Sequence, residues 1–232
     1  KADFVILYED EDIIVIDKPA GMASHASTRE PDMPSAEGAL AYYLPADVVP
    51  HPVSRLDRGT SGAMTFAKSG YIHELLREQF GTEDFYKEYL GICVGTPDPP
   101  CGSIDAPTGF AEGSRYKRAG RPDGVPSFTE YETLETRNGL SLVRLVPHTG
   151  RMHQLRVHMA YIGCPLVGDW LYGEENKALI ARPALHAGLV RFRQPMTGEV
   201  VEVRAEWPED MERVWGKAAD LSGQQQGMVQ LV

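Results

Sequence analysis

The sequence contains little cysteine and no long apolar run. Its three cysteines, Cys93, Cys101 and Cys164, form no Cys-x-x-Cys pair, which excludes a disulfide scaffold and favours a reducing compartment. No apolar stretch approaches the roughly 18 residues of a membrane-spanning helix, and the first residues show no signal-peptide pattern. We therefore expect a cytoplasmic protein that does not enter a membrane.

The sequence also lacks the motifs of several large enzyme classes. It contains no Walker motif, no dinucleotide-binding glycine pattern and no serine in an elbow motif. Phosphoryl, hydride and acyl transfer therefore lack their usual residues. The chain has 232 residues, 42% hydrophobic and 24% charged, an ordinary globular composition. Its length fits one large domain or two small ones.

The net charge of −10 argues weakly against a nucleic-acid partner, but the charge is unevenly distributed. Residues 1–20 carry six acids and two lysines, and residues 199–212 carry six acids and one arginine. Residues 141–193 hold seven Lys or Arg against three acids, and residues 114–121 hold four basic residues and no acid. These two segments predict a local basic surface, although solvated loops give the same pattern.

Apolar spacing predicts many strands and few helices. Strands are expected at residues 5–7, 13–16, 63–67, 85–94, 129–134, 141–146, 185–192 and 200–205. Helices are expected at residues 35–44, 69–81 and 152–162. Residues 96–107 look turn-rich. Because strands and helices do not alternate regularly, we expect an α+β fold with a mixed, mostly antiparallel sheet flanked by helices and loops.

One candidate site is Ser-Arg-Leu-Asp-Arg-Gly-Thr-Ser-Gly at residues 54–62. Asp57 lies between Arg55 and Arg58, just ahead of a turn that contains Thr60. Nearby cations favour the charged carboxylate, which suits a nucleophile or an electrostatic stabiliser better than a general acid. A surface ion pair without function explains this segment at least as well.

A second candidate site is His-Thr-Gly-Arg-Met-His-Gln-Leu-Arg-Val-His at residues 148–158. Its three histidines are spaced by five residues, and on a helix this spacing separates side chains by about 140°. A metal site is therefore disfavoured. The segment also begins a predicted helix, whose first amides together with Arg151 and Arg156 favour an anion.

A third feature is the expected strand that contains Phe85, Lys87 and Tyr89. If these residues point to one face, an aromatic ring stands beside a cation. Aromatic platforms of this kind stack nucleobases, but a half-buried tyrosine in a sheet is an equally good interpretation.

These segments occur together with further motifs in a fixed order. The ordered blocks are Ile-Leu-Tyr-Glu-Asp at 6–10, Asp-Lys-Pro-Ala-Gly-Met at 17–22, residues 55–62, Lys-Glu-Tyr-Leu at 87–90, residues 148–158, Pro-Leu-Val-Gly-Asp at 165–169, Leu-His-Ala at 185–187 and Gln-Pro-Met-Thr-Gly-Glu at 194–199. Together they resemble the RluA-like family of RNA pseudouridine synthases over roughly residues 5–210. The resemblance implies that family's fold and its reaction, the isomerisation of specific uridines in ribosomal RNA or tRNA.

The resemblance also assigns roles to residues. Asp57 falls on the family's catalytic aspartate, Tyr89 on the tyrosine that stacks on the target base, and Arg156 on the arginine that pairs with the aspartate. Arg55 falls on the residue that fills the space left by the flipped uridine. The other expected substrate contacts are Arg58, Thr60, Lys117, Arg118, Arg151, His153 and Leu185.

Three positions depart from the family pattern. Ser54 stands where the family usually has histidine, Met152 replaces Thr or Ser, and Cys164 replaces His or Asn. None of these is a residue with an assigned catalytic role, so activity is still expected. The departures concern substrate contacts.

The isomerisation transfers no electron and no external group, so we expect no cofactor and no metal. We further expect one catalytic domain over residues 1–232 without an N-terminal RNA-binding appendage, no obligatory protein partner, and a monomer whose partner is an RNA stem-loop. Two rival hypotheses are an RNA-binding protein without catalysis and a glycosidase-like hydrolase. The hydrolase requires a second carboxylate across the scissile bond, and neither motif supplies one.

Overall fold

The computed structural model describes residues 4–26 and 33–226, with side chains as far as residue 218. The chain divides into two compact units. Unit 1 comprises Lys1–Tyr89 and His186–Glu206, and unit 2 comprises Leu90–Leu185 and Trp207–Val232. The expectation of a single catalytic domain stays a prediction.

Strands dominate both units, as expected from the sequence. The strands are β1 (Val5–Glu9), β2 (Ile13–Lys18), β3 (His51–Pro52), β4 (Ser61–Ala67), β5 (Phe85–Val94), β6 (Cys101–Asp105), β7 (Thr108–Phe110), β8 (Arg118–Gly120), β9 (Phe128–Arg137), β10 (Leu140–Pro147), β11 (Leu185–Arg193) and β12 (Val200–Arg204). The helices are α1 (Ala36–Tyr43), α2 (Gly70–Glu78), α3 (Gln154–Tyr161) and α4 (Glu209–Gln226). The α+β class is confirmed.

In unit 1, strands β1, β2, β4 and β11 are neighbours in that order, with β3 paired to β4 and β12 to β11. These strands pair antiparallel except for β4 and β11, which pair parallel through His186 with Ser61 and Ala187 with Gly62. This confirms a mixed, mostly antiparallel sheet. Its core contains Ile13 and Val15 of β2, Phe192 of β11 and the helix residue Leu76.

Both helices of unit 1 begin at serine caps. The hydroxyl oxygen of Ser35 accepts from the amide of Gly38, and that of Ser69 accepts from the amide of Ile72. Helix α2 ends at Glu78 rather than at Gly81. The amides of the next two residues donate to carbonyls only three residues back, so the last turn tightens and Phe80 lies beyond the end of the helix.

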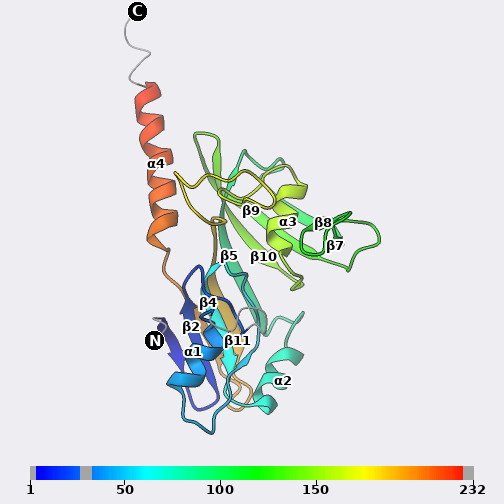
Figure 1. Cartoon of the computed structure of the whole chain (residues 1–232), viewed down its shortest axis with the longest axis vertical. Coiled ribbons are helices and arrows are strands. Elements are labelled where there is room, and N and C mark those ends of the chain that lie inside the picture. The colour runs from blue at the N-terminus through cyan, green and yellow to red at the C-terminus, as the bar shows by residue number, and fades with distance from the viewer. Residues whose placement is uncertain (1–3, 27–32, 227–232) are drawn as a thin grey trace, which may run out of the picture. The chain divides into compact units, whose positions relative to one another are not determined.

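In unit 2, strands β5, β10, β9 and β6 are neighbours in that order, and Figure 1 shows α3 beside them, close to the short β7–β8 hairpin. The turn that joins β9 to β10 is formed by Asn138 and Gly139, whose φ values are 46° and 76°. The turn-rich assignment of residues 96–107 is wrong in part. Residues 101–105 form β6, because the backbone of this short polar segment completes its hydrogen bonds against β9.

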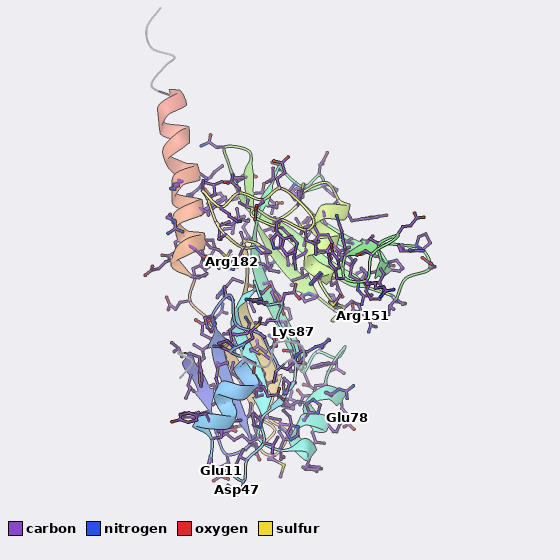
Figure 2. The ribbon with its side chains drawn as sticks, viewed as in Figure 1. Glu11, Asp47, Glu78, Lys87, Arg151 and Arg182 are labelled. Carbon is purple, nitrogen blue, oxygen red and sulfur yellow. The ribbon has the colours of Figure 1, made fainter. Side chains whose placement is uncertain are left out.

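Helix α4 is the largest element that the sequence analysis did not predict. Its residues Met211, Val214 and Trp215 pack in the core of unit 2 with Ile92 and Ile180. Arg182, labelled in Figure 2, donates two hydrogen bonds to the carboxylate of Asp210 in the first turn of α4. Among the described residues, no helix combines the length and apolarity needed to cross a membrane.

Candidate active site

The loop between β3 and β4 carries Asp57 and is fixed by a buried serine. The hydroxyl of Ser24 donates to the carbonyl of Leu56 at 2.6 Å and accepts from the amide of Leu56 at 3.0 Å. On the other side of Asp57, the amide of Thr60 donates to the Asp57 carbonyl at 2.9 Å. Because the backbone is held on both sides, the carboxylate projects from a defined position.

The segment that carries Ser24 supports the same loop at Arg58. The amide of Gly21 donates to the Arg58 carbonyl at 2.7 Å, and Arg58 Nε donates to the Gly21 carbonyl at 3.1 Å. The fully buried ammonium of Lys18 donates to the carbonyls of Pro19 and Met22. The hydrogen bonds of Lys18 therefore fix the backbone of residues 18–24, and this segment in turn supports the Asp57 loop.

The loop enters β4 at a glycine that no other residue replaces without strain. Gly62 has φ +111°, and a Cβ atom there would lie 2.3 Å from the carbonyl oxygen of Ala187. Beside it, the buried Ser61 hydroxyl and His186 Nδ1 share a hydrogen bond of 2.9 Å. The close approach of β4 to β11 thus sets where the Asp57 loop ends.

Tyr89 lies within electrostatic reach of Asp57. The side chain is buried, at 7% exposure. Burial raises the pKa of the Tyr89 hydroxyl, and the Asp57 carboxylate raises it further. The phenol therefore stays neutral at physiological pH. Two predicted catalytic residues, Asp57 and Tyr89, therefore lie near each other in unit 1. The predicted substrate residue Arg55 is exposed.

Lys87 contacts other aromatic rings of unit 1. Its ammonium lies 5.4 Å from the ring centroid of Phe80 and 5.9 Å from that of Phe85. Burial lowers the pKa of Lys87. The expected pairing of a cation with an aromatic ring is present: Lys87 lies near Phe85 of the same strand, and also near Phe80, which follows α2.

In unit 2, Arg156 is held by a buried carboxylate. Helix α3 carries Arg156, and its guanidinium donates from Nε and Nη2 to both oxygens of Asp169, at 2.7 and 2.8 Å. The two side chains are 7% and 0% exposed. A charge buried this deeply needs such a partner, because its desolvation is otherwise uncompensated.

The side chain of Tyr172 contacts several residues for which the sequence predicted a role. His153 Nδ1 shares a hydrogen bond of 2.8 Å with the Tyr172 hydroxyl, and the amide of Arg118 donates to that hydroxyl at 3.0 Å. The guanidinium carbon of Arg156 lies 5.0 Å from the ring centroid, and Lys117 Nζ lies 5.8 Å from it. Unit 2 thus brings together four residues that the sequence analysis selected separately.

The three histidines of residues 148–158 have separate partners. His148 pairs with Glu130, His153 with Tyr172, and His158 with Thr129 and the Ala106 carbonyl. Over residues 4–26 and 33–218, no group of three or more His, Cys, Asp or Glu side chains is placed to hold a metal ion. Each histidine of this segment thus has its own protein partner.

The remaining predicted contacts differ in exposure. Arg151 is exposed and donates to the Pro126 carbonyl at 3.2 Å. Arg118 stacks on Phe110, with its guanidinium carbon 3.8 Å from the ring centroid. Leu185 is buried at 3% exposure, and its carbonyl accepts from Arg182.

Arg121 belongs to the basic segment 114–121 but has an internal partner. It donates two hydrogen bonds of 2.8 Å to the carboxylate of Asp123. Its charge is therefore partly compensated within the hairpin region.

The sequence analysis gave no role to Ser24, Asp169 or Tyr172. Asp169 stood at the end of a recognised block, and Tyr172 followed it three residues later. Ser24 offered no signal, because its hydroxyl acts on a backbone 32 residues away.

Comparisons with known proteins identify the family of this chain. A model of the RNA pseudouridylate synthase family matches residues 12–161, a span that contains Asp57, Tyr89 and Arg156. The chain belongs to this family, and its class is that of an isomerase. The resemblance found in the sequence motifs is thereby confirmed.

Several relatives are similar over most of the chain. One is the uncharacterized RNA pseudouridine synthase YlyB of Bacillus subtilis, 36% identical over 90% of this chain and 71% of that protein. Another is the ribosomal large subunit pseudouridine synthase D of Vibrio cholerae, 37% identical over 89% of this chain and 68% of that protein. Among solved structures, the human RNA pseudouridylate synthase domain containing 4 has a TM-score of 0.74 at 25% identity, covering 93% of both chains.

Proposed function

We propose that this protein isomerises specific uridines in ribosomal RNA or tRNA to pseudouridine, with Asp57 as the catalytic residue. The observation that carries the proposal is the carboxylate on a loop fixed by Ser24 and Thr60, within electrostatic reach of the neutral phenol of Tyr89. Membership of the pseudouridine synthase family supplies the reaction class.

The reaction balances without an external reagent. The bond between uracil N1 and ribose C1′ breaks, the base rotates, and a bond forms between C5 and C1′. C5 loses a proton and N1 gains one, so no electron and no external group is transferred. The Asp57 carboxylate has three chemically sound roles: attack on C1′, addition to the uracil ring, or removal of a ribose proton that starts an elimination.

The other proposed residues act on the base and the RNA backbone. A uridine within a stack must be extruded, which costs a few kcal/mol. Tyr89 is proposed as the ring on which the extruded base stacks, and Arg55 as the side chain that fills the vacated space. Arg156 is proposed as a catalytic cation, and Arg58, Thr60, Arg151, His153 and Leu185 as substrate contacts.

Charge on the β7–β8 hairpin supports an RNA partner. Arg115 and Lys117 are exposed there. Because the whole chain carries a net charge of −10, phosphate binding depends on such local basic surface. We also propose that the protein acts as a monomer in the cytoplasm, without an obligatory protein partner.

The test uses unmodified transcripts of large-subunit ribosomal RNA and of tRNA. The purified protein is incubated with each RNA, and pseudouridine is mapped by chemical labelling and primer extension. Wild type is expected to modify particular uridines, and Asp57→Asn to modify none while it still binds the RNA. The exposed Asp47, labelled in Figure 2, gives the matched control Asp47→Asn, which should retain activity.

Two outcomes count against the proposal. If wild type binds these RNAs but forms no pseudouridine, the alternative of a binding protein without catalysis is correct. If Asp57→Asn keeps more than about 1% of wild-type turnover, Asp57 is not the catalytic residue.

A further inference from the structure

Tyr172 lies on a turn built by the same carboxylate that holds Arg156. Asp169 Oδ1 accepts hydrogen bonds from the amides of Leu171 and Tyr172, at 3.1 and 3.3 Å. The amide of Gly173 donates to the Asp169 carbonyl at 2.8 Å and closes the turn. The position of the tyrosine and the position of the arginine therefore depend on one side chain.

The ring of Tyr172 provides the second support for Arg156. Asp169 occupies one edge of the guanidinium, and the ring centroid of Tyr172 lies 5.0 Å from its central carbon. Arg156 is buried, and a cation–π contact gains strength where the cation is desolvated. Removing the ring would take away this contact and keep the hydrogen bonds to Asp169.

The hydroxyl of Tyr172 contacts different elements. It accepts from the amide of Arg118 in β8 and shares a hydrogen bond with His153, the residue just ahead of α3. His153 has φ 58°, a left-handed conformation that residues other than glycine rarely adopt. A hydrogen bond to the side chain helps to hold such a conformation. Figure 1 shows the β7–β8 hairpin close to α3. The hydroxyl thus bonds to a residue of the hairpin and to the residue that precedes α3.

We propose that Tyr172 is a positioning residue with two separable functions, which rests on the proposed pseudouridine synthase activity. Its hydroxyl fixes the basic hairpin and His153 for RNA binding, and its ring fixes the guanidinium of Arg156 for the chemical step. The hydroxyl therefore acts on KM and on RNA affinity, whereas the ring acts on kcat. A residue with only a structural role would not divide its effects in this way.

The experiment compares Tyr172→Phe with Tyr172→Leu, using an RNA transcript that wild type modifies. Tyr172→Phe keeps the ring but loses the hydrogen bonds to the Arg118 amide and to His153. We therefore expect KM to rise by at least about 3-fold, with kcat within about 2-fold of wild type. Tyr172→Leu also loses the ring, so we expect kcat to fall about 10- to 100-fold, as for a misplaced catalytic group. Tyr71 is 67% exposed on α2, and its Phe and Leu variants are the matched controls.

A second measurement does not depend on catalysis. Hydrogen exchange of the peptide that covers residues 115–121 reports the amide of Arg118, whose partner is the Tyr172 hydroxyl. Exchange there should be about 3- to 10-fold faster in Tyr172→Phe than in Tyr71→Phe. This measurement remains informative if Tyr172→Leu does not fold.

Each result decides the proposal. Unchanged exchange at residues 115–121 in Tyr172→Phe shows that the hydroxyl does not fix the hairpin, and the proposal is then wrong. Equal kcat values for the Phe and Leu variants show that the ring does not position Arg156. If wild type modifies no RNA, the proposed function fails by itself, and the exchange result still tests the link between Tyr172 and the hairpin.

Discussion

Replacing Ser24 with alanine tests whether the Asp57 loop is held as the structure indicates. Ser24 is 5% exposed, and its hydroxyl is the partner of both the amide and the carbonyl of Leu56. Ser24→Ala removes one oxygen and no carbon, so packing changes little. Two buried backbone groups next to Asp57 lose their partner.

The magnitude follows from those two groups. An unsatisfied buried donor or acceptor costs about 1–3 kcal/mol, so the free energy of unfolding should fall by about 2–4 kcal/mol after some relaxation of the loop. The loop should also explore conformations that misplace the Asp57 carboxylate. At a temperature where the variant is folded, we therefore expect kcat to fall by about tenfold or more.

The assay combines urea unfolding with single-turnover pseudouridine formation. Ser103 is exposed on β6, and Ser103→Ala is the matched control, expected within about 0.5 kcal/mol of wild type. A Ser24→Ala protein as stable as this control would show that the two hydrogen bonds between Ser24 and Leu56 do not stabilise the fold. A Ser24→Ala protein that is destabilised but retains the wild-type kcat would show that these hydrogen bonds stabilise the fold without positioning Asp57.

Three further predictions concern the base, the RNA backbone and pH. Tyr89→Ala should weaken binding of RNA with a flipped uridine by roughly 1–3 kcal/mol relative to Tyr89→Phe, and equal affinities of the two folded variants would show that the ring does not contact the base. Replacing Lys117 and Arg118 together by glutamine should flatten the slope of log affinity against log salt by about 0.7 per lost phosphate contact. Arg121→Gln should change that slope less, because Asp123 already pairs with Arg121. If the salt titration of the Lys117 and Arg118 double variant overlays that of wild type, these two residues do not bind phosphate. Burial lowers the pKa of His158 from its ordinary 6.5, so below that pH the unfolded chain binds a proton that the folded protein does not. Stability should therefore fall as the pH drops from 6.5 toward the folded pKa, by at most about 1.4 kcal/mol per pH unit, and urea unfolding of His158→Asn should show a smaller pH dependence.

Local patterns in the sequence predicted much of the fold. The helices expected at residues 35–44 and 69–81 are present, and a serine caps each of them; the Asn138-Gly139 pair forms the turn between two expected strands. These features depend on residues within a few positions of one another, so their physics is visible in a short window. The same holds for the strand at residues 85–94, whose bounds the structure reproduces.

Elements that depend on distant partners were harder to predict. The strand β6 has a polar sequence and is specified by its pairing with β9. Helix α4 does have helical apolar spacing at Met211, Val214 and Trp215. That spacing follows an acidic stretch, which the sequence analysis treated only as charge.

The candidate site also contains two kinds of residue: those proposed to react, and those that position them. Asp57 and Arg156 are conspicuous in sequence because charged residues in motifs imply chemistry, and the family resemblance adds their roles. Ser24 and Tyr172 are ordinary residue types whose function arises only from what the fold brings to them: a backbone 32 residues away for Ser24, and the amide of a residue 54 positions away for Tyr172. Asp57 is supported by contacts within unit 1 and Arg156 by contacts within unit 2. Substitutions at Ser24 and at Tyr172 should therefore perturb different catalytic groups, and their effects on the free energy of unfolding should add.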